Sequence, residues 1–282
     1  MEKKGILGSP LGFEVLQELH ALDQIPRGSE GFDPEKNWSH IYRIWSSYGY
    51  WEKNNFDNGW LKIQREVNLS DATQDFRITQ LINNFTGRKS DLGVFNLVTA
   101  KLKCHLNELA TPIQWKLESQ FYYEDNSLDL PEIGLIKTGK INNSILSVST
   151  NGKMREQTID RNVTSNWSLC ESIQRLPLND SAKLDFTYME DLVVIKNDHH
   201  LSYQGLRSSG MSEKEDQLHY FQQLGRGVFP FEYYLDTNHE CLMIVTGPRA
   251  YILDDSATDI FNKRHPWLKD EITNRIDASE VG

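Results

Sequence analysis

The chain has 282 residues, of which 38% are hydrophobic and 11% aromatic, so it can bury a substantial core within one large domain. Its formal net charge is −10, which argues against a nucleic-acid partner because such binding depends on the neutralisation of phosphates. No stretch approaches the roughly 18 apolar residues that cross a bilayer, so the sequence predicts a soluble protein without a membrane span.

The first 59 residues are expected to form a helical and aromatic segment that packs on a sheet. Ser9 and Pro10 form a helix start, and apolar residues then recur on one face until the chain reaches Pro26. A second helix is predicted to reach about residue 47, because four apolar residues have helical spacing: Trp38, Ile41, Trp45 and Tyr48.

The N-terminus and the cysteines bear on the cellular compartment. A basic pair opens the chain, but the sustained apolar stretch of a secretory signal does not follow it. We therefore expect a cytoplasmic location, or an extracytoplasmic one if the natural chain starts further upstream. Three widely spaced cysteines fit neither a disulfide framework nor a four-ligand zinc site, so buried thiols are expected at Cys104, Cys170 and Cys241.

Residues 60–255 are predicted to form an antiparallel β domain. Apolar and polar residues alternate with a period of two from Trp60 onward, which is typical of half-buried strands. Turns such as Asn151-Gly152 are too short for crossover helices, so consecutive strands must be antiparallel. The clearest alternation is near the C-terminal end of this domain, where one strand face is formed by Phe229, Phe231, Tyr233 and Leu235. Residues 192–195 and 201–203 are predicted as two separate strands.

One helix is predicted to interrupt the sheet near 165–176. Thr164 or Ser165 can cap it, and Pro177 ends it. Its apolar face is formed by Trp167, Cys170, Ile173 and Leu176. This face is expected to cover one side of the sheet.

The expected fold is therefore mainly β: a large, strongly bent antiparallel meander of about twelve strands, half-barrel or barrel-like, with two N-terminal helices and one inserted helix. At the level of fold alone, it resembles the curved sheets with an inserted helix of periplasmic lipoprotein carriers and other lipid-binding half-barrels. That resemblance implies a concave face that receives a ligand. Residues 256–282 are expected to form a C-terminal tail.

Aromatic residues are concentrated between positions 38 and 60, where four of the seven tryptophans lie. Such rings can stack on sugars, seal a lipid cavity or pack in a core. The first functional hypothesis is a non-catalytic protein that binds a small-molecule, glycan or lipid ligand on an aromatic-lined concave face. The candidate ligand-binding residues are Tyr48, Tyr50, Trp51 and Trp60.

The second hypothesis is a carbohydrate-active hydrolase or lyase. Glu190 and Asp191 are candidates for its acid and base, because paired carboxylates cleave glycosidic bonds. His199, His200 and Tyr203 follow as further candidates. Neighbouring residues of a strand face opposite sides, so the two histidines are not expected to share a metal ion, and no metal or cofactor site is predicted. A third hypothesis is a protein-interaction module that uses edge strands or the acidic surface.

Overall fold

All strands of the described part belong to one sheet. The computed structural model describes residues 26–46, 55–83, 94–123, 134–159, 162–208, 217–247, 249–266 and 269. These residues form fifteen strands and two helices. The strands are β1 (Trp38–Ser46), β2 (Asn55–Asn68), β3 (Thr73–Asn83), β4 (Val94–His105), β5 (Pro112–Tyr123), β6 (Leu135–Asn142), β7 (Ile145–Thr150), β8 (Lys153–Thr158), β9 (Val163–Ser165), β10 (Lys183–Glu190), β11 (Val194–Ser208), β12 (Gln217–Leu224), β13 (Phe231–Leu235), β14 (Cys241–Thr246) and β15 (Arg249–Leu253). The helices are α2 (Ser168–Gln174) and α3 (Ala257–Arg264).

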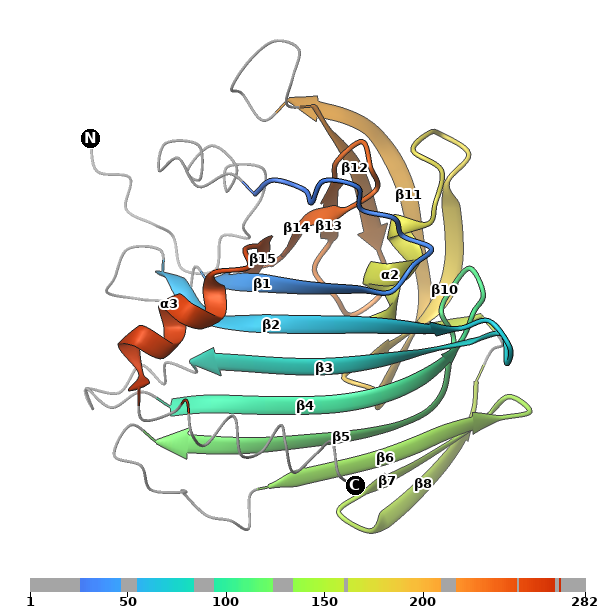
Figure 1. Ribbon diagram of the computed structural model, residues 1–282. Helices are drawn as coiled ribbons and strands as arrows, with labels where there is room; N and C mark the ends of the chain where they lie inside the picture. Colours follow the sequence, from blue (N-terminus) through green and yellow to red (C-terminus); the bar gives the residue numbers. More distant parts are fainter. Residues whose placement is uncertain are drawn as a thin grey trace.

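The strand order makes the sheet an almost closed meander. The chain runs outward from β1 to β8, starts again at the opposite edge with β9, and returns strand by strand until β15 pairs with β1. Among the described strands, only β9 and β10 pair in parallel. In Figure 1, β1 to β5 lie side by side across the front, β10 to β12 rise behind them, and α2 lies between the two walls. The sheet is therefore barrel-like but stays open between β8 and β9.

The predicted helix that reaches about residue 47 is wrong, because Trp38–Ser46 form β1. Tyr42 and Ile44 lie in the main core, while Ile41 packs against a second cluster on the other face of the sheet. A strand that is buried on both faces carries apolar residues at odd and even positions, and these can match helical spacing by chance. The other predicted N-terminal helix, after Pro10, lies outside the described residues.

The strand prediction needs two further corrections. Residues 192–195 and 201–203 are not separate strands, since β11 continues through the polar residues between them, with Asp198 at a φ of 60° where the register with β10 shifts. The expected C-terminal tail contains α3, which packs on β1 and β2. The turn predictions are confirmed at Asn151 and Gly152, which have positive φ between β7 and β8. The division into segments 1–59, 60–255 and 256–282 stays a prediction.

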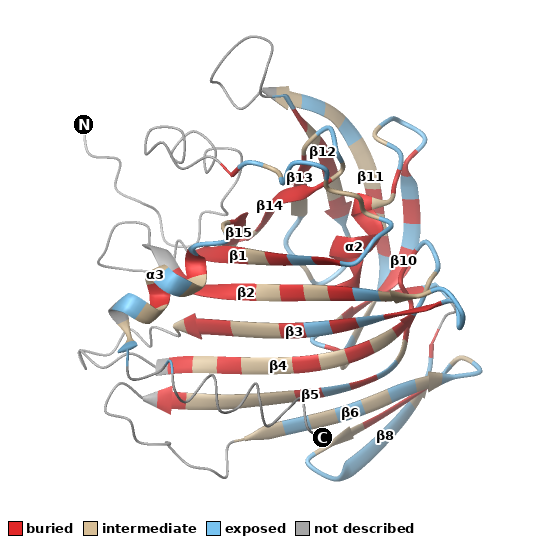
Figure 2. Ribbon diagram, in the orientation of Figure 1, coloured by how far each residue is buried: buried red, intermediate tan, exposed pale blue. Residues whose placement is uncertain are grey.

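Two apolar clusters lie on opposite faces of the sheet. The larger one fills the interior and includes the buried face of α2, and the smaller one lies under α3. Figure 2 shows β13 and β14 buried along most of their length, whereas β8 at the open edge is largely exposed. The strands near the closed side are thus more deeply buried than the strand at the open edge.

Buried charges hold α2 inside the sheet. Glu171 of α2 forms ion pairs with Arg65 of β2, at 3.0 Å, and with Arg175. Arg65 also donates from Nε to Gln74 Oε1 at 2.6 Å and from Nη1 to the Lys36 carbonyl at 2.8 Å. Desolvation raises the pKa of Glu171 and lowers the pKa of Arg65. Since both charges are buried, the position of α2 depends on their pairing.

Candidate functional site

A hollow of about 610 Å³ lies inside the curled sheet beside α2, and we call it the interior pocket. Its volume is within the range of small-molecule sites. The lining residues come from α2, β2, β3, β10 and β13 to β15, together with the loops before α2 and β13 and the turn after β10. They are Leu61, Ile63, Gln80, Asn166, Trp167, Cys170, Tyr188, Glu190, Asp191, Gly227, Val228, Phe229, Phe231, Tyr233, Ile244, Thr246, Arg249 and Tyr251.

Strand register builds the apolar wall of the interior pocket. Tyr233, Ile244 and Tyr251 are direct partners across β13, β14 and β15, so their side chains point to the same face. The next row on that face consists of Phe231, Thr246 and Arg249. The wall therefore changes from an apolar row to a row that carries one cation.

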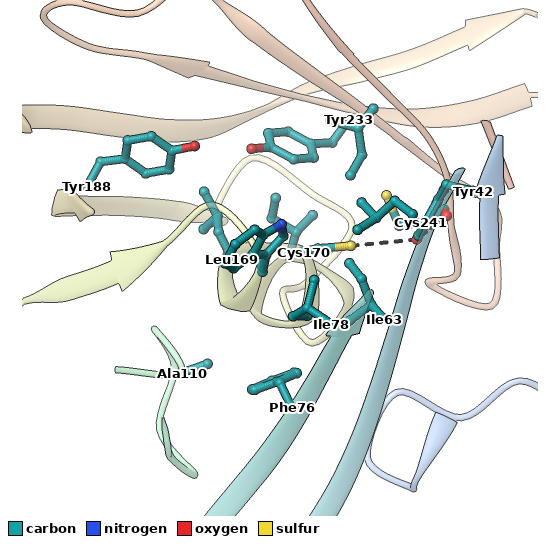
Figure 3. Packing of buried hydrophobic residues seen from close by; sticks show 14 of the residues in the cluster. Tyr42, Ile63, Phe76, Ile78, Ala110, Leu169, Cys170, Tyr188, Tyr233 and Cys241 are labelled. Carbon is teal, nitrogen blue, oxygen red and sulfur yellow. Dashed lines mark hydrogen bonds between the residues drawn. The ribbon is translucent and has the colours of Figure 1, made fainter. Parts of the chain in front are cut away.

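Two tyrosines of the large cluster face each other across the interior. In Figure 3, the hydroxyl groups of Tyr188 and Tyr233 point toward one another above α2. Tyr233 donates to Gln223 Oε1 at 2.7 Å. Desolvation raises the pKa of both phenols well above the usual value of 10.0. Both therefore stay protonated at neutral pH and contribute aromatic surface and neutral hydroxyl groups.

Charged side chains gather where β10 ends. Glu190 is paired with Lys196 at 2.8 Å, and the Asp191 backbone N–H donates to Asn166 Oδ1 at 3.2 Å. Asp191 has a φ of 47°, in the left-handed region that turns the chain out of the strand. Its pKa is raised by desolvation and then by the Glu190 carboxylate, although its side chain reaches solvent. The pocket thus has a polar end with both signs of charge.

At the polar end of the pocket, Arg249 is a cation with a hydrogen-bond donor that has no acceptor among the described residues. Its Nε is buried and has no hydrogen-bond acceptor among the residues that the structure describes. The side chain also hydrogen-bonds the Tyr251 phenol, which lines the same pocket. A buried guanidinium N–H without an acceptor costs free energy unless another group supplies one. An anionic or carbonyl oxygen in the pocket would supply it.

The candidate catalytic residues are only partly brought together. Glu190 and Asp191 both line the interior pocket. His199 is buried beside it, stacks on Tyr188 with ring centroids 5.0 Å apart, and lies 3.0 Å from Gln223 Nε2 through its Nδ1. His200 faces the other side of β11 and pairs with Asp185 at 2.7 Å. Tyr203 contacts His219 Nδ1 at 2.9 Å.

The candidate aromatic ligand residues lie elsewhere. Tyr48, Tyr50 and Trp51 fall outside the described residues. Trp60 lies in the small cluster under α3, on the face of the sheet opposite the interior pocket. The pocket's aromatic rings come instead from the loop before α2 and from the C-terminal half of the sheet.

A second hollow, of about 670 Å³, lies on the outer face of β2 to β8. Along each strand, the residues that form its floor alternate with residues of the buried core, and several of the floor residues are charged. Arg77 pairs with Glu66, and Lys116 pairs with Glu118. Such exposed pairs are typical of a solvated sheet face.

The described part of the chain contains neither a metal-ligand cluster nor a membrane-spanning helix. No group of three or more His, Cys, Asp and Glu side chains there is placed to hold a metal ion. None of the described helices has the length and apolar character needed to cross a bilayer.

Arg249 and Tyr251 were missed at the level of sequence, although a signal exists. They alternate with Ala250 and Ile252 in a short strand, which places the arginine on the same face as an aromatic residue. A cation on a predicted inward face is unusual enough to indicate a site. Which face points inward, however, depends on the pairing of β15 with β1, a contact between distant parts of the chain.

Comparison with known proteins supports the fold and leaves the family open. No protein-family model matches the chain, and no curated protein matches it. Among solved structures, it is similar to a β-barrel-like protein of a domain of unknown function, DUF1849, from Brucella abortus. The identity is 9% and the TM-score 0.50, and the match covers 77% of this chain and 94% of that one. This likeness establishes a mainly β, barrel-like architecture.

Proposed function

We propose that this protein binds an amphipathic small molecule in its interior pocket. The observation that carries the proposal is the layout of the pocket, in which an apolar row of Tyr233, Ile244 and Tyr251 adjoins a row that ends in Arg249. Sites for small molecules are mostly apolar and contain a few polar groups that orient the ligand. The apolar part of the ligand would lie along the first row and its polar group beside the second.

The polar group of the ligand is inferred to be an anion such as a carboxylate. The buried Nε of Arg249 needs an acceptor, and hydrogen bonds between a guanidinium and a carboxylate are strong. Lys196 neutralises Glu190, which lowers the cost of placing an anion nearby. Fatty carboxylates fit this description better than neutral sugars, which need many polar partners.

Phe229 is the proposed contact at the entrance. Its side chain is 58% exposed although it lines the pocket, and its ring packs against Gly247. An exposed aromatic ring at the edge of a hollow gains buried area when a ligand covers it. Its truncation should therefore weaken binding with little effect on folding.

The test is a competition titration with a fluorescent long-chain carboxylate, displaced by dodecanoate or by dodecanol. We expect R249Q to weaken dodecanoate binding about tenfold or more, because a hydrogen bond to a charged group contributes roughly 1.5–3 kcal/mol. Dodecanol binding should change little in R249Q. F229A should weaken both ligands to a similar extent.

The matched control is R77Q, which removes an exposed arginine from the outer face. It should leave both affinities unchanged. Equal losses for dodecanoate and dodecanol in R249Q would contradict the anion contact. Failure of both compounds to bind the unmodified protein would contradict the proposed function.

A carbohydrate-active hydrolase is the second candidate, because Glu190 and Asp191 line one pocket and differ in environment. Glu190 is paired with Lys196, whereas Asp191 has a raised pKa, and such a split suits a base and an acid. Hydrolysis of a panel of aryl glycosides that is lost in both E190Q and D191N would favour this candidate. Turnover that persists in either variant would exclude it.

A further inference from the structure

Two buried cysteines and a tyrosine form a cluster at the floor of the interior pocket. The Tyr42 hydroxyl lies 3.6 Å from Cys170 Sγ and donates to the Cys241 carbonyl at 3.0 Å. Cys241 is tied to α2 through its backbone N–H, which donates to Gln174 Oε1 at 2.9 Å. In Figure 3, the sulfur atoms of Cys170 and Cys241 both lie on the same side of Tyr42, and the dashed line joins Cys170 to the Tyr42 hydroxyl.

The two thiols are neighbours beside Tyr42 but have different surroundings. Both side chains are buried. Cys170 lines the interior pocket, whereas Cys241 lies behind it. The hydrogen bond from Cys241 lowers the pKa of Cys170, while burial raises the pKa of Cys241 well above its usual value. Cys170 is therefore the more acidic thiol and the one that a small molecule in the pocket can reach.

We propose that Cys170 and Cys241 form a reversible disulfide when a peroxide enters the interior pocket. The Cys170 thiolate attacks one peroxide oxygen, so that an S–O bond forms and the O–O bond breaks. The leaving hydroxide takes a proton and becomes water. The Cys241 sulfur then attacks the Cys170 sulfenic acid, which forms the S–S bond and releases a second water. Two thiols are thereby oxidised and one hydrogen peroxide is reduced.

The disulfide would join α2 to β14 across the core. Neighbouring packing already holds the two residues together, through Tyr42 and Gln174. The bond would close a long loop between distant positions of the chain, which restricts the unfolded ensemble. Oxidation would therefore stabilise the fold and fix the pocket floor.

Cys104 provides the matched control thiol. It is equally buried in the main core, but it lies on β4 and does not line the interior pocket. Burial raises its pKa well above the usual value. It should therefore remain a thiol under conditions that oxidise the other two.

The experiment treats the folded full-length protein with hydrogen peroxide, then denatures it, alkylates free thiols and maps the peptides by mass spectrometry. The expected result is a cross-linked peptide pair containing Cys170 and Cys241, with Cys104 alkylated and the whole reversed by dithiothreitol. The midpoint of thermal unfolding should rise by about 5–10 °C in the oxidised protein. C104S should still form the cross-link, and C241S should give a Cys170 sulfenic acid that dimedone traps. Full alkylation of all three cysteines after peroxide treatment, or a cross-link through Cys104, would overturn the proposal.

Discussion

Among single residues, Glu240 makes the stability of this protein depend on pH. Its buried carboxylate lies 3.1 Å from His40 Nε2 and accepts hydrogen bonds from the backbone N–H and hydroxyl group of Ser29. Burial acts to raise the pKa of Glu240, but the bonds to His40 and Ser29 outweigh it and lower the pKa below 4.5. The stability that this group contributes is therefore present above pH 4.5 and is lost as the pH falls through the lowered pKa.

The first prediction is that Glu240→Gln lowers the free energy of unfolding at neutral pH by about 1–3 kcal/mol, because His40 and Ser29 lose a charged acceptor. The variant should also lose less stability than the unmodified protein when the pH is lowered below 4.5. Urea unfolding at neutral pH and at about pH 4 measures both effects. An identical pH dependence in the two proteins would show that Glu240 does not contribute to it.

Residue chemistry in the pocket could be predicted only in part. Glu190 and Asp191 were predicted as candidates because they form a pair of carboxylates, and both line the interior pocket. The pairing of Glu190 with Lys196 and the unused donor of Arg249 could not be foreseen, because they depend on how β10, β11 and β15 meet in space.

Among the elements, α2 is a short helix whose position depends on one ion-pair network. It has only seven residues, too few to be stable as an isolated helix, so tertiary contacts must hold it. Its apolar face packs in the main cluster, and Glu171 joins it to β2 through Arg65. The floor of the interior pocket is thus positioned by a buried charge pair.

We therefore predict that Glu171→Gln destabilises the protein by about 3–5 kcal/mol, since it leaves the Arg65 charge without its buried partner. The exposed pair between Glu66 and Arg77 is the control, and Glu66→Gln should change the unfolding free energy by less than about 1 kcal/mol. Chemical denaturation of both variants measures the difference. A small effect of Glu171→Gln would mean that packing alone holds α2.

Element prediction succeeded where one face of a strand is polar or a turn has a local signal. The hairpin that joins β7 and β8 was found from Asn151 and Gly152, which adopt positive φ. It failed at β1, whose two buried faces remove the alternation that identifies a strand. The inserted helix was predicted from its apolar face, but it begins only at Ser168, because Ser165 belongs to β9.

The whole molecule is a meander whose two halves meet at β1 and β15 and remain apart at β8 and β9. A bent antiparallel sheet was predictable, because a sheet of many strands that are joined by short turns must curl. The pairing of the two ends of the described chain was not, since it joins residues about 200 positions apart and leaves no local pattern. That pairing gathers β2, β13, β14 and β15 around one pocket.

The measurement that tests the central claim most directly is photo-crosslinking with a diazirine-bearing long-chain carboxylate, followed by peptide mapping. If the interior pocket is the binding site, the label will attach to pocket residues such as Trp167, Phe229 and Tyr251, and excess dodecanoate will suppress it. Labelling confined to the outer hollow, for example at Lys116 or Met154, would contradict the account, as would labelling that dodecanoate leaves unchanged.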